Sequence, residues 1–230
     1  MSDTFYQKLT AIRHHIHQHP EVSEKEYNTT RFIKEQLQNI GIEPLDYPLK
    51  TGVIAEIGHG YPIIALRADI DALPIFEKTG LAYASDNGAM HACGHDFHQT
   101  SLLGAAERLK QQEATLKGTV RLIFQAAEEH FQGGHQVIAA GGIEGVSAIV
   151  GYHNNPHLKP GQISLRSGAI MAGVEQFAVT VKGISAHAVR PDLGVDTVLV
   201  ITTIINNLQS IVSRTISPFQ SAVLSVTHID

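Results

Sequence analysis

Short runs of apolar residues alternate with helical patterns along the first part of the chain. A helix is predicted from about Thr4 to Gln18. A second is predicted from Ser23 to Gly41, because Ser23 and Glu26 have the S-x-x-E spacing of a capping box. Apolar runs bounded by glycine or proline predict four buried strands, over 52–58, 62–70, 118–126 and 147–153. With further helices predicted over 99–112 and around 135–140, this order favours an α/β fold with a mostly parallel sheet flanked by helices.

The pattern changes in the last part of the chain. Apolar and polar side chains alternate over 175–183, which predicts a strand with one exposed face. A helix over 196–213 and a strand over 221–229 follow. We therefore expect a first domain over 1–172 and a smaller, incomplete α+β domain over 173–230.

Composition and charge narrow the class of protein. At 230 residues with 43% hydrophobic content, the chain can bury one sizeable core or two modest ones. A formal net charge of -5 without a long basic run argues against nucleic acid as a partner. We expect no secretory leader, since the opening residues lack a basic region followed by an apolar run, and no membrane span, since no apolar run reaches the roughly 20 residues that a span needs. Cys93 is the single cysteine, which fits a reducing, cytoplasmic compartment.

The segment "MHACGHDFH", over 90–98, carries the strongest chemical signal. Cys93 and His95 are separated by one residue in a predicted glycine-containing loop, so a thiolate and an imidazole can meet the same metal ion. Two ligands do not hold a catalytic metal. A buried cysteine beside a surface histidine explains this segment equally well.

Further candidate ligands follow other predicted strands. Glu128 and Glu129 come after an apolar strand, at the edge where α/β sheets place their sites. Adjacent residues leave a strand on opposite sides, so one carboxylate could bind metal while the other acts as a general base. A solvated surface pair is the alternative. His153 follows the strand that begins at Ser147, again at the carboxyl edge.

Acidic residues also end a fourth predicted strand. Asp69 and Asp71 lie one residue apart and would point to the same face, where carboxylates could orient metal-bound imidazoles. A turn or helix-capping role is equally plausible from these residues. We reject a metal site at the N-terminal histidines, which are His14, His15, His17 and His19. We also set aside four histidines near the motifs, which are His98, His130, His135 and His157.

Five segments, "RADIDALP", "MHACGHDFH", "AAEEH", "VGYHNNP" and "GISAHAVRP", occur in this order. Together they resemble the zinc- or manganese-dependent amidohydrolases that include aminoacylases, hippurate hydrolases, N-acyl amino-acid deacetylases and auxin-conjugate hydrolases. The resemblance implies a di-metal exopeptidase-like catalytic domain with two divalent ions, zinc, manganese, nickel or cobalt. Glu128 would be the general base and Asp71 a supporting residue, and the metal ligands would be Cys93, His95, Glu129 and His153.

The resemblance also implies an inserted lid domain that forms a homodimer. His187 would reach toward the active site of a partner subunit and stabilise the oxyanion, whereas the residue by itself, without the resemblance, favours a simple loop role. The implied substrate is a small-molecule N-acyl amino acid, and a dipeptide is an open alternative.

Relatives of this kind carry a further histidine ligand near their C-terminus, whereas this sequence ends at Asp230 inside the expected lid. We therefore expect a C-terminally truncated chain, and a non-catalytic remnant that binds at most one metal weakly is a second hypothesis. A structural zinc protein is a weaker third, because such sites usually contain several cysteines.

Overall fold

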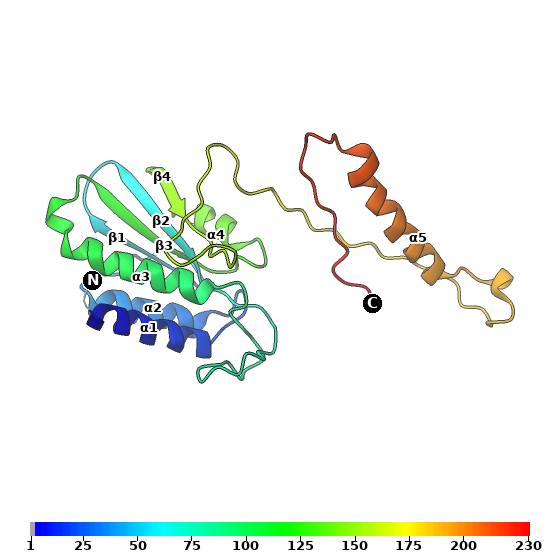
Figure 1. The fold of residues 1–230 in the computed structure, drawn as a ribbon, viewed down its shortest axis with the longest axis horizontal. Coiled ribbons are helices and arrows are strands. Elements are labelled where there is room, and N and C mark those ends of the chain that lie inside the picture. Colours follow the sequence, from blue (N-terminus) through cyan, green and yellow to red (C-terminus); the bar gives the residue numbers. More distant parts are fainter. Residues whose placement is uncertain (1–2) are drawn as a thin grey trace. The chain divides into compact units, whose positions relative to one another are not determined.

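A four-stranded mixed sheet is the centre of the first of two units, Met1–Ile163 and Ser164–Asp230, into which the chain divides. The computed structural model describes residues 3–230. The strands follow the order β1-β3-β2-β4, with bounds Val53–Gly58 for β1, Ile63–Asp69 for β2, Thr119–Gln125 for β3 and Val146–Gly151 for β4 (Figure 1). Strands β2, β3 and β4 run parallel, and β1 pairs antiparallel with β3. The four strands predicted in this part of the chain and the mostly parallel sheet are confirmed.

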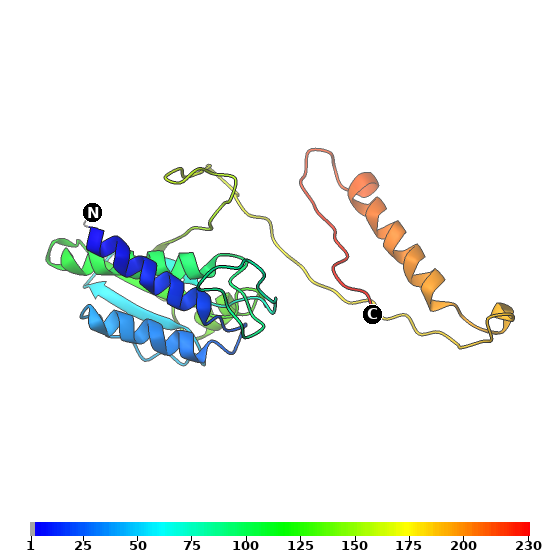
Figure 2. The same ribbon diagram turned by 60° about the horizontal axis from the view of Figure 1, so that its bottom comes forward.

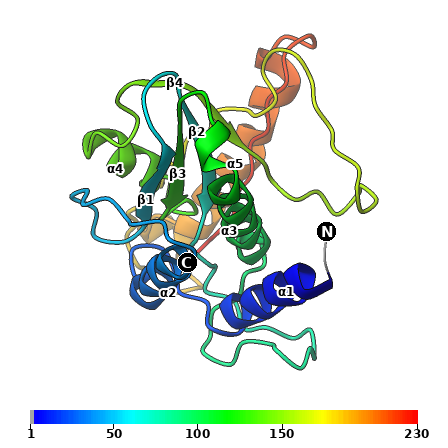
Figure 3. The ribbon, with the colours of Figure 1, turned by 90° about the vertical axis from the view of Figure 1, so that its left-hand side faces the viewer.

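Helices cover both faces of this sheet (Figure 3). One face packs against three helices and the other against one short helix, with bounds Asp3–Gln18 for α1, Tyr27–Asn39 for α2, His95–Gln111 for α3 and Gly133–Ala139 for α4. Successive side chains of β3 point to opposite faces of the sheet, and therefore pack against different helices. Leu122 and Phe124 join the larger core with α1, α2 and α3, whereas Ile123 packs on the opposite face with Val137 of α4. A short 3-10 turn, Glu113–Thr115, separates α3 from β3.

The predicted capping box at the start of α2 is wrong. The helix begins at Tyr27, four residues later than Ser23, and no side chain at its N-cap position, Glu26, bonds to it. The first amides of α2 are instead bonded to the carboxylate of Glu21. Both side chains of the predicted box form hydrogen bonds with residues distant in sequence: Ser23 Oγ donates to Asp71, and Glu26 accepts from the amide of Ala127.

Helix α3 begins at His95, four residues earlier than predicted. Its first turns bury polar side chains, including Asp96 and Gln99, so the apolar period that normally marks a helix is missing there. Gly94 precedes the helix with a φ of 86°, in the left-handed region that favours glycine. His95 therefore lies on a helix and not in a loop.

The second unit contains the predicted helix but not the predicted strands (Figure 2). Helix α5, Thr197–Ser210, is capped by Asp196, whose side chain accepts hydrogen bonds from two amides, and it continues into a π-helical turn, Ile211–Thr215. A 3-10 turn, Pro191–Leu193, precedes it.

Neither 175–183 nor 221–229 forms a strand, so both predictions are wrong. A strand requires a neighbour that pairs with its backbone, and the pairing in this unit is the isolated bridge between Ile184 and Val195. The domain division at residue 172 stays a prediction. In the part of the chain that the structure describes, each helix is too short or too polar to cross a membrane.

We predict that Phe124→Ala lowers the free energy of unfolding by about 3–5 kcal/mol, because it leaves a cavity in the larger core. Phe124 is 1% exposed at the centre of the sheet. Phe76, which is 75% exposed, provides the matched control, and Phe76→Ala should change the free energy by about 0.5 kcal/mol or less. Urea denaturation followed by circular dichroism measures both. Equal effects of the two substitutions would contradict this core.

Candidate metal centre

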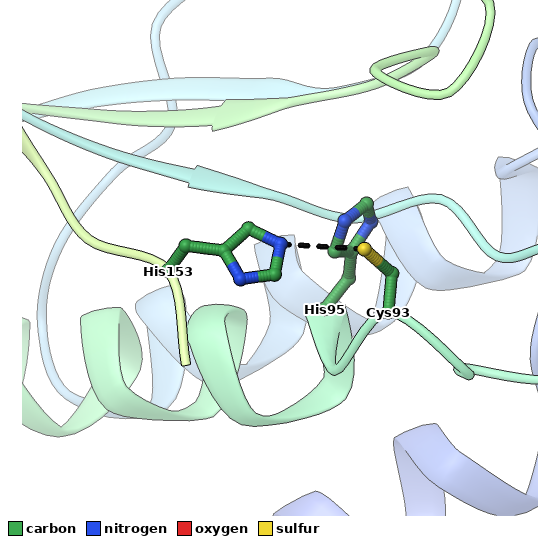
Figure 4. A group of neighbouring side chains, drawn as sticks. All are labelled: Cys93, His95 and His153. Atoms are coloured by element: carbon green, nitrogen blue, oxygen red, sulfur yellow. Dashed lines mark hydrogen bonds between the residues drawn. The ribbon is translucent and has the colours of Figure 1, made fainter. Parts of the chain in front are cut away.

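The carboxyl ends of the three parallel strands bring the candidate residues together. Asp69 is the last residue of β2, Glu128 and Glu129 lie in the turn after β3, and His153 follows β4 by two residues. Helix α3 points its first residue, His95, at this edge, and Cys93 precedes it. Figure 4 shows Cys93 and His153 facing each other beside the ring of His95.

Three groups of side chains with metal-ligand chemistry meet here, and all contain His95. Within each group the candidate ligand atoms lie within 4.8 Å of one another, and the groups are Cys93–His95–His153, His95–Glu128–Glu129 and Asp69–His95–His98. Cys93 Sγ lies 3.3 Å from His153 Nε2. His95 Nε2 lies 3.8 Å from Glu129 Oε1 and 3.9 Å from Glu128 Oε2. The centre thus combines one sulfur, imidazole nitrogens and carboxylate oxygens.

Glu128 and Glu129 do not leave a strand on opposite sides, as we expected. Strand β3 ends at Gln125, so both residues belong to the following turn, and both carboxylates approach the same nitrogen of His95. The two side chains differ instead in how much of each is exposed to solvent. The Glu128 side chain is 34% exposed and that of Glu129 is 22% exposed, so Glu128 is the carboxylate nearer to solvent.

Hydrogen bonds fix the ring of His95 so that one nitrogen is left free. Its Nδ1 donates to the main-chain carbonyl of Asp71 at 2.9 Å, which turns Nε2 toward the carboxylates. Among the residues that the structure describes, His95 Nε2 and Glu129 Oε1 are buried and without a hydrogen-bond partner. Buried polar atoms are normally paired. A divalent cation, which accepts both nitrogen and oxygen ligands, fits this pair of atoms.

The charges around the centre favour a cation. Burial disfavours protonation of His95, but the hydrogen bond to Asp71 and the charge of Asp69 outweigh burial and raise its pKa to about 8. Burial, followed by the charge of Glu129, raises the pKa of the Cys93 thiol to about 12. Burial and the charge of Asp69 also raise the pKa of Glu128. These shifts have one origin, which is negative charge gathered in a partly buried site.

Asp71 connects the parts of the centre. Its Oδ2 accepts a hydrogen bond from Ser23 Oγ at 2.7 Å and from the amide of Glu129 at 3.0 Å. Burial opposes ionisation of Asp71, but hydrogen bonds from His95, Ser23 and Glu129 lower its pKa. The residue therefore orients a candidate ligand, His95, and fixes the backbone of another, Glu129.

His98, which matches no ligand position in the motifs and was set aside, lies in the centre. It is 1% exposed, its Nδ1 lies 2.6 Å from Asp69 Oδ1, and its Nε2 lies 2.6 Å from Asn154 Oδ1. Burial opposes ionisation of Asp69, but the hydrogen bond from His98 and the charges of His95 and Arg67 hold its pKa at about 2. The usable signal was spacing, because residues three apart on a helix share a face.

The remaining histidines have other surroundings. His17 is buried between two carboxylates, with Nδ1 3.0 Å from Asp96 Oδ2 and Nε2 3.0 Å from Glu77 Oε1. His187 belongs to the second unit, where its Nδ1 accepts a hydrogen bond from the amide of Val189 at 3.2 Å. A catalytic role for His187 stays a prediction.

Comparisons with known proteins agree with this centre. The family model described as peptidase family M20/M25/M40 matches residues 65–225. An N-acetyl-L-cysteine deacetylase of Bacillus subtilis is 49% identical over 99% of this chain, and an IAA-amino acid hydrolase of Arabidopsis thaliana is 42% identical over 99%. A solved structure from Bacillus subtilis, described as a dinuclear metal binding peptidase, matches 68% of this chain with 53% identity and a TM-score of 0.67.

Fold and site together define an α/β protein with a candidate metal centre of cysteine, histidine and glutamate at the carboxyl edge of a mixed sheet. The chain belongs to peptidase family M20/M25/M40. It spans about half the length of these relatives, 55% of the deacetylase, 53% of the plant hydrolase and 45% of the solved chain.

We predict that His95 titrates near pH 8 in the metal-free protein, since Asp71 and Asp69 favour its charged form. Because this pKa lies above the ordinary value of 6.5, protonation of His95 stabilises the fold fully below pH 6.5, and this contribution is lost as the pH rises through 8. Asp71→Asn should lower the pKa, because it removes the carboxylate of Asp71 that favours the charged form of His95. Histidine NMR measures both pKa values. An unchanged pKa in Asp71→Asn would contradict the assigned cause.

Proposed function

We propose that the protein containing this chain is a metal-dependent amidohydrolase that cuts the amide bond of N-acyl amino acids. The observation that carries the proposal is the cluster around His95, in which two buried candidate ligand atoms, His95 Nε2 and Glu129 Oε1, lack a hydrogen-bond partner in the described structure. The choice of substrate class is supported by relatives that are named as an N-acetyl-L-cysteine deacetylase and an IAA-amino acid hydrolase.

Two divalent metal ions are the proposed cofactor. Cys93, His95, Glu129 and His153 would hold them, as a mixed set of ligands that suits zinc, manganese, nickel or cobalt. Metal ions bound there would activate a water and polarise the scissile carbonyl. His95 and Cys93 would have to lose their protons first, so metal uptake should release protons and become weaker as the pH falls.

Glu128 is the proposed general base. It faces the same nitrogen of His95 as Glu129 does, but it is more exposed and its pKa is raised by burial and by Asp69. A carboxylate with a raised pKa holds a proton more readily than a free one. Glu128 would therefore take a proton from the attacking water and give it to the departing amine. Asp71 would keep His95 and Glu129 in place meanwhile.

The second unit is proposed to act as a lid, with residues 173–230 as part of a dimerisation domain. Apolar side chains of α5 are exposed, including Val198 at 68% and Leu199 at 65%, which supports a surface that a second copy covers. His187 would stabilise the oxyanion of the reaction in a homodimer. Its exposed position within the unit leaves the imidazole accessible for that role.

Dipeptide hydrolysis is a second candidate activity. The matching family is described as a peptidase family, and the solved relative as a dinuclear metal binding peptidase. A dipeptide presents the same amide next to the same carboxylate as an N-acyl amino acid. Parallel assays with N-acetyl amino acids, N-benzoyl amino acids and dipeptides would rank the two classes.

We predict that Glu128→Gln lowers kcat for N-acetyl amino acids by about 10²- to 10⁴-fold, because an amide cannot take the proton of water. Metal content by elemental analysis should stay at that of the unsubstituted protein. Glu35→Gln makes the same change on an exposed face of α2, where the side chain is 58% exposed, and should leave kcat unaltered.

Two results would count against the proposed function. If purified protein binds no stable metal and releases no amino acid after zinc or manganese is added, the hypothesis of a non-catalytic remnant is the better one. If Glu128→Gln retains full kcat, the chemistry does not use Glu128 as its base.

A further inference from the structure

The backbone is held by a carboxylate on each side of Glu128. The amide of Glu129 donates to Asp71 Oδ2 at 3.0 Å, and the amide of Ala127 donates to Glu26 Oε1 at 2.8 Å. Glu128 itself lies between these two fixed points. Its main-chain position therefore depends on two buried acids that are distant in sequence: Asp71 lies 58 residues from Glu129, and Glu26 lies 101 residues from Ala127.

Ala127 needs such an anchor because of its backbone conformation. Its φ is 49°, in the left-handed region that a non-glycine residue rarely occupies without support. The residue is fully buried, so its amide cannot turn to water for a partner. Its carbonyl is used as well, and accepts hydrogen bonds from the amides of Gln132 and Gly133. The acceptor on Glu26 thus supports the residue that starts the whole turn.

The side chain of Glu26 forms a hydrogen bond with this turn and none with the start of its own helix. It stands at the N-cap position of α2, yet its side chain makes no cap hydrogen bond, and Glu21 bonds to the first amides instead. The residue is 0% exposed, and its second oxygen accepts from Thr51 Oγ1 at 2.9 Å. A buried carboxylate is costly to maintain without such partners. Burial raises the pKa of Glu26, and the hydrogen bond from Ala127 opposes that rise.

We propose that Glu26 is a positioning residue that sets the Glu128–Glu129 pair through the amide of Ala127. It belongs to none of the candidate metal-ligand groups, and it acts through the backbone amide of Ala127. The inference rests on the proposed function for its catalytic consequence, since Glu128 is the proposed base and Glu129 a proposed ligand. The structural consequence, a fixed turn over 126–133, is independent of that function.

Glu26→Met tests the proposal, because methionine fills a similar space but has no oxygen acceptor. We expect faster amide hydrogen exchange over 126–133 in the metal-free protein. Zinc affinity, measured by competition with a chromophoric chelator, should fall by roughly 10- to 100-fold, and kcat should fall similarly with little change in KM. Glu26→Gln keeps a carbonyl acceptor for Ala127, so it should restore all three properties nearly to those of the unsubstituted protein.

Thr51→Val is the matched control. It removes the other hydrogen bond to Glu26 in an isosteric way and leaves the bond to Ala127 in place. Exchange over 126–133, zinc affinity and kcat should all stay close to those of the unsubstituted protein. If Thr51→Val reproduces the losses of Glu26→Met, the effect is a general disturbance of the buried acid and the proposal is overturned.

The readouts separate this proposal from the proposed function. An unsubstituted protein that binds no zinc and hydrolyses nothing would refute the proposed function, while hydrogen exchange would still decide whether Glu26 fixes the turn. An active unsubstituted protein whose Glu26→Met variant has the same exchange, zinc affinity and kcat would refute the positioning role alone.

Discussion

The hydrogen bonds of Asp71 connect the segments that build the candidate metal centre. Its main-chain carbonyl orients His95 on α3, and its carboxylate holds the amide of Glu129 after β3 and the hydroxyl of Ser23 before α2. Each of these groups is buried or partly buried, so none can replace Asp71 by water at small cost. Asp71 therefore keeps the strand end, the helix start and the turn in contact at the centre.

Charge is the second constraint on the centre. Acidic side chains gather around His95. Their charges raise the pKa of His95 against the effect of burial, and together with burial they raise the pKa of Cys93. Such an arrangement is unfavourable in isolation, because like charges repel and buried charges lose hydration. Neutralisation by protonated His95 in the metal-free chain, and by metal ions in the proposed enzyme, offsets the same repulsion. The stability of the site and its capacity for a metal thus have one physical source.

The buried acids Glu26 and Asp71 extend this network into the fold. Both come from segments that connect regular elements, and both accept an amide hydrogen bond from the turn that carries the two candidate glutamates. The turn has no regular secondary structure to hold it, and Ala127 adopts a left-handed conformation within it. A pair of buried acceptors gives this irregular backbone the rigidity that a general base needs, because proton transfer tolerates little displacement of its atoms.

The sequence alone determined the strands of the first unit, the segments that carry Cys93, Glu129 and His153, and the family. These features are local, because the pattern of apolar residues within a segment predicts a strand, and the type of a residue predicts whether it can bind a metal. Tertiary structure decided the rest. The strands expected over 175–183 and 221–229 are absent, since a period of two specifies an exposed face but supplies no neighbour to pair with. Ser23 and Glu26 have the spacing of a helix cap, yet bond to Asp71 and Ala127, because the partner that a buried polar group finds depends on which distant segments the fold brings beside it.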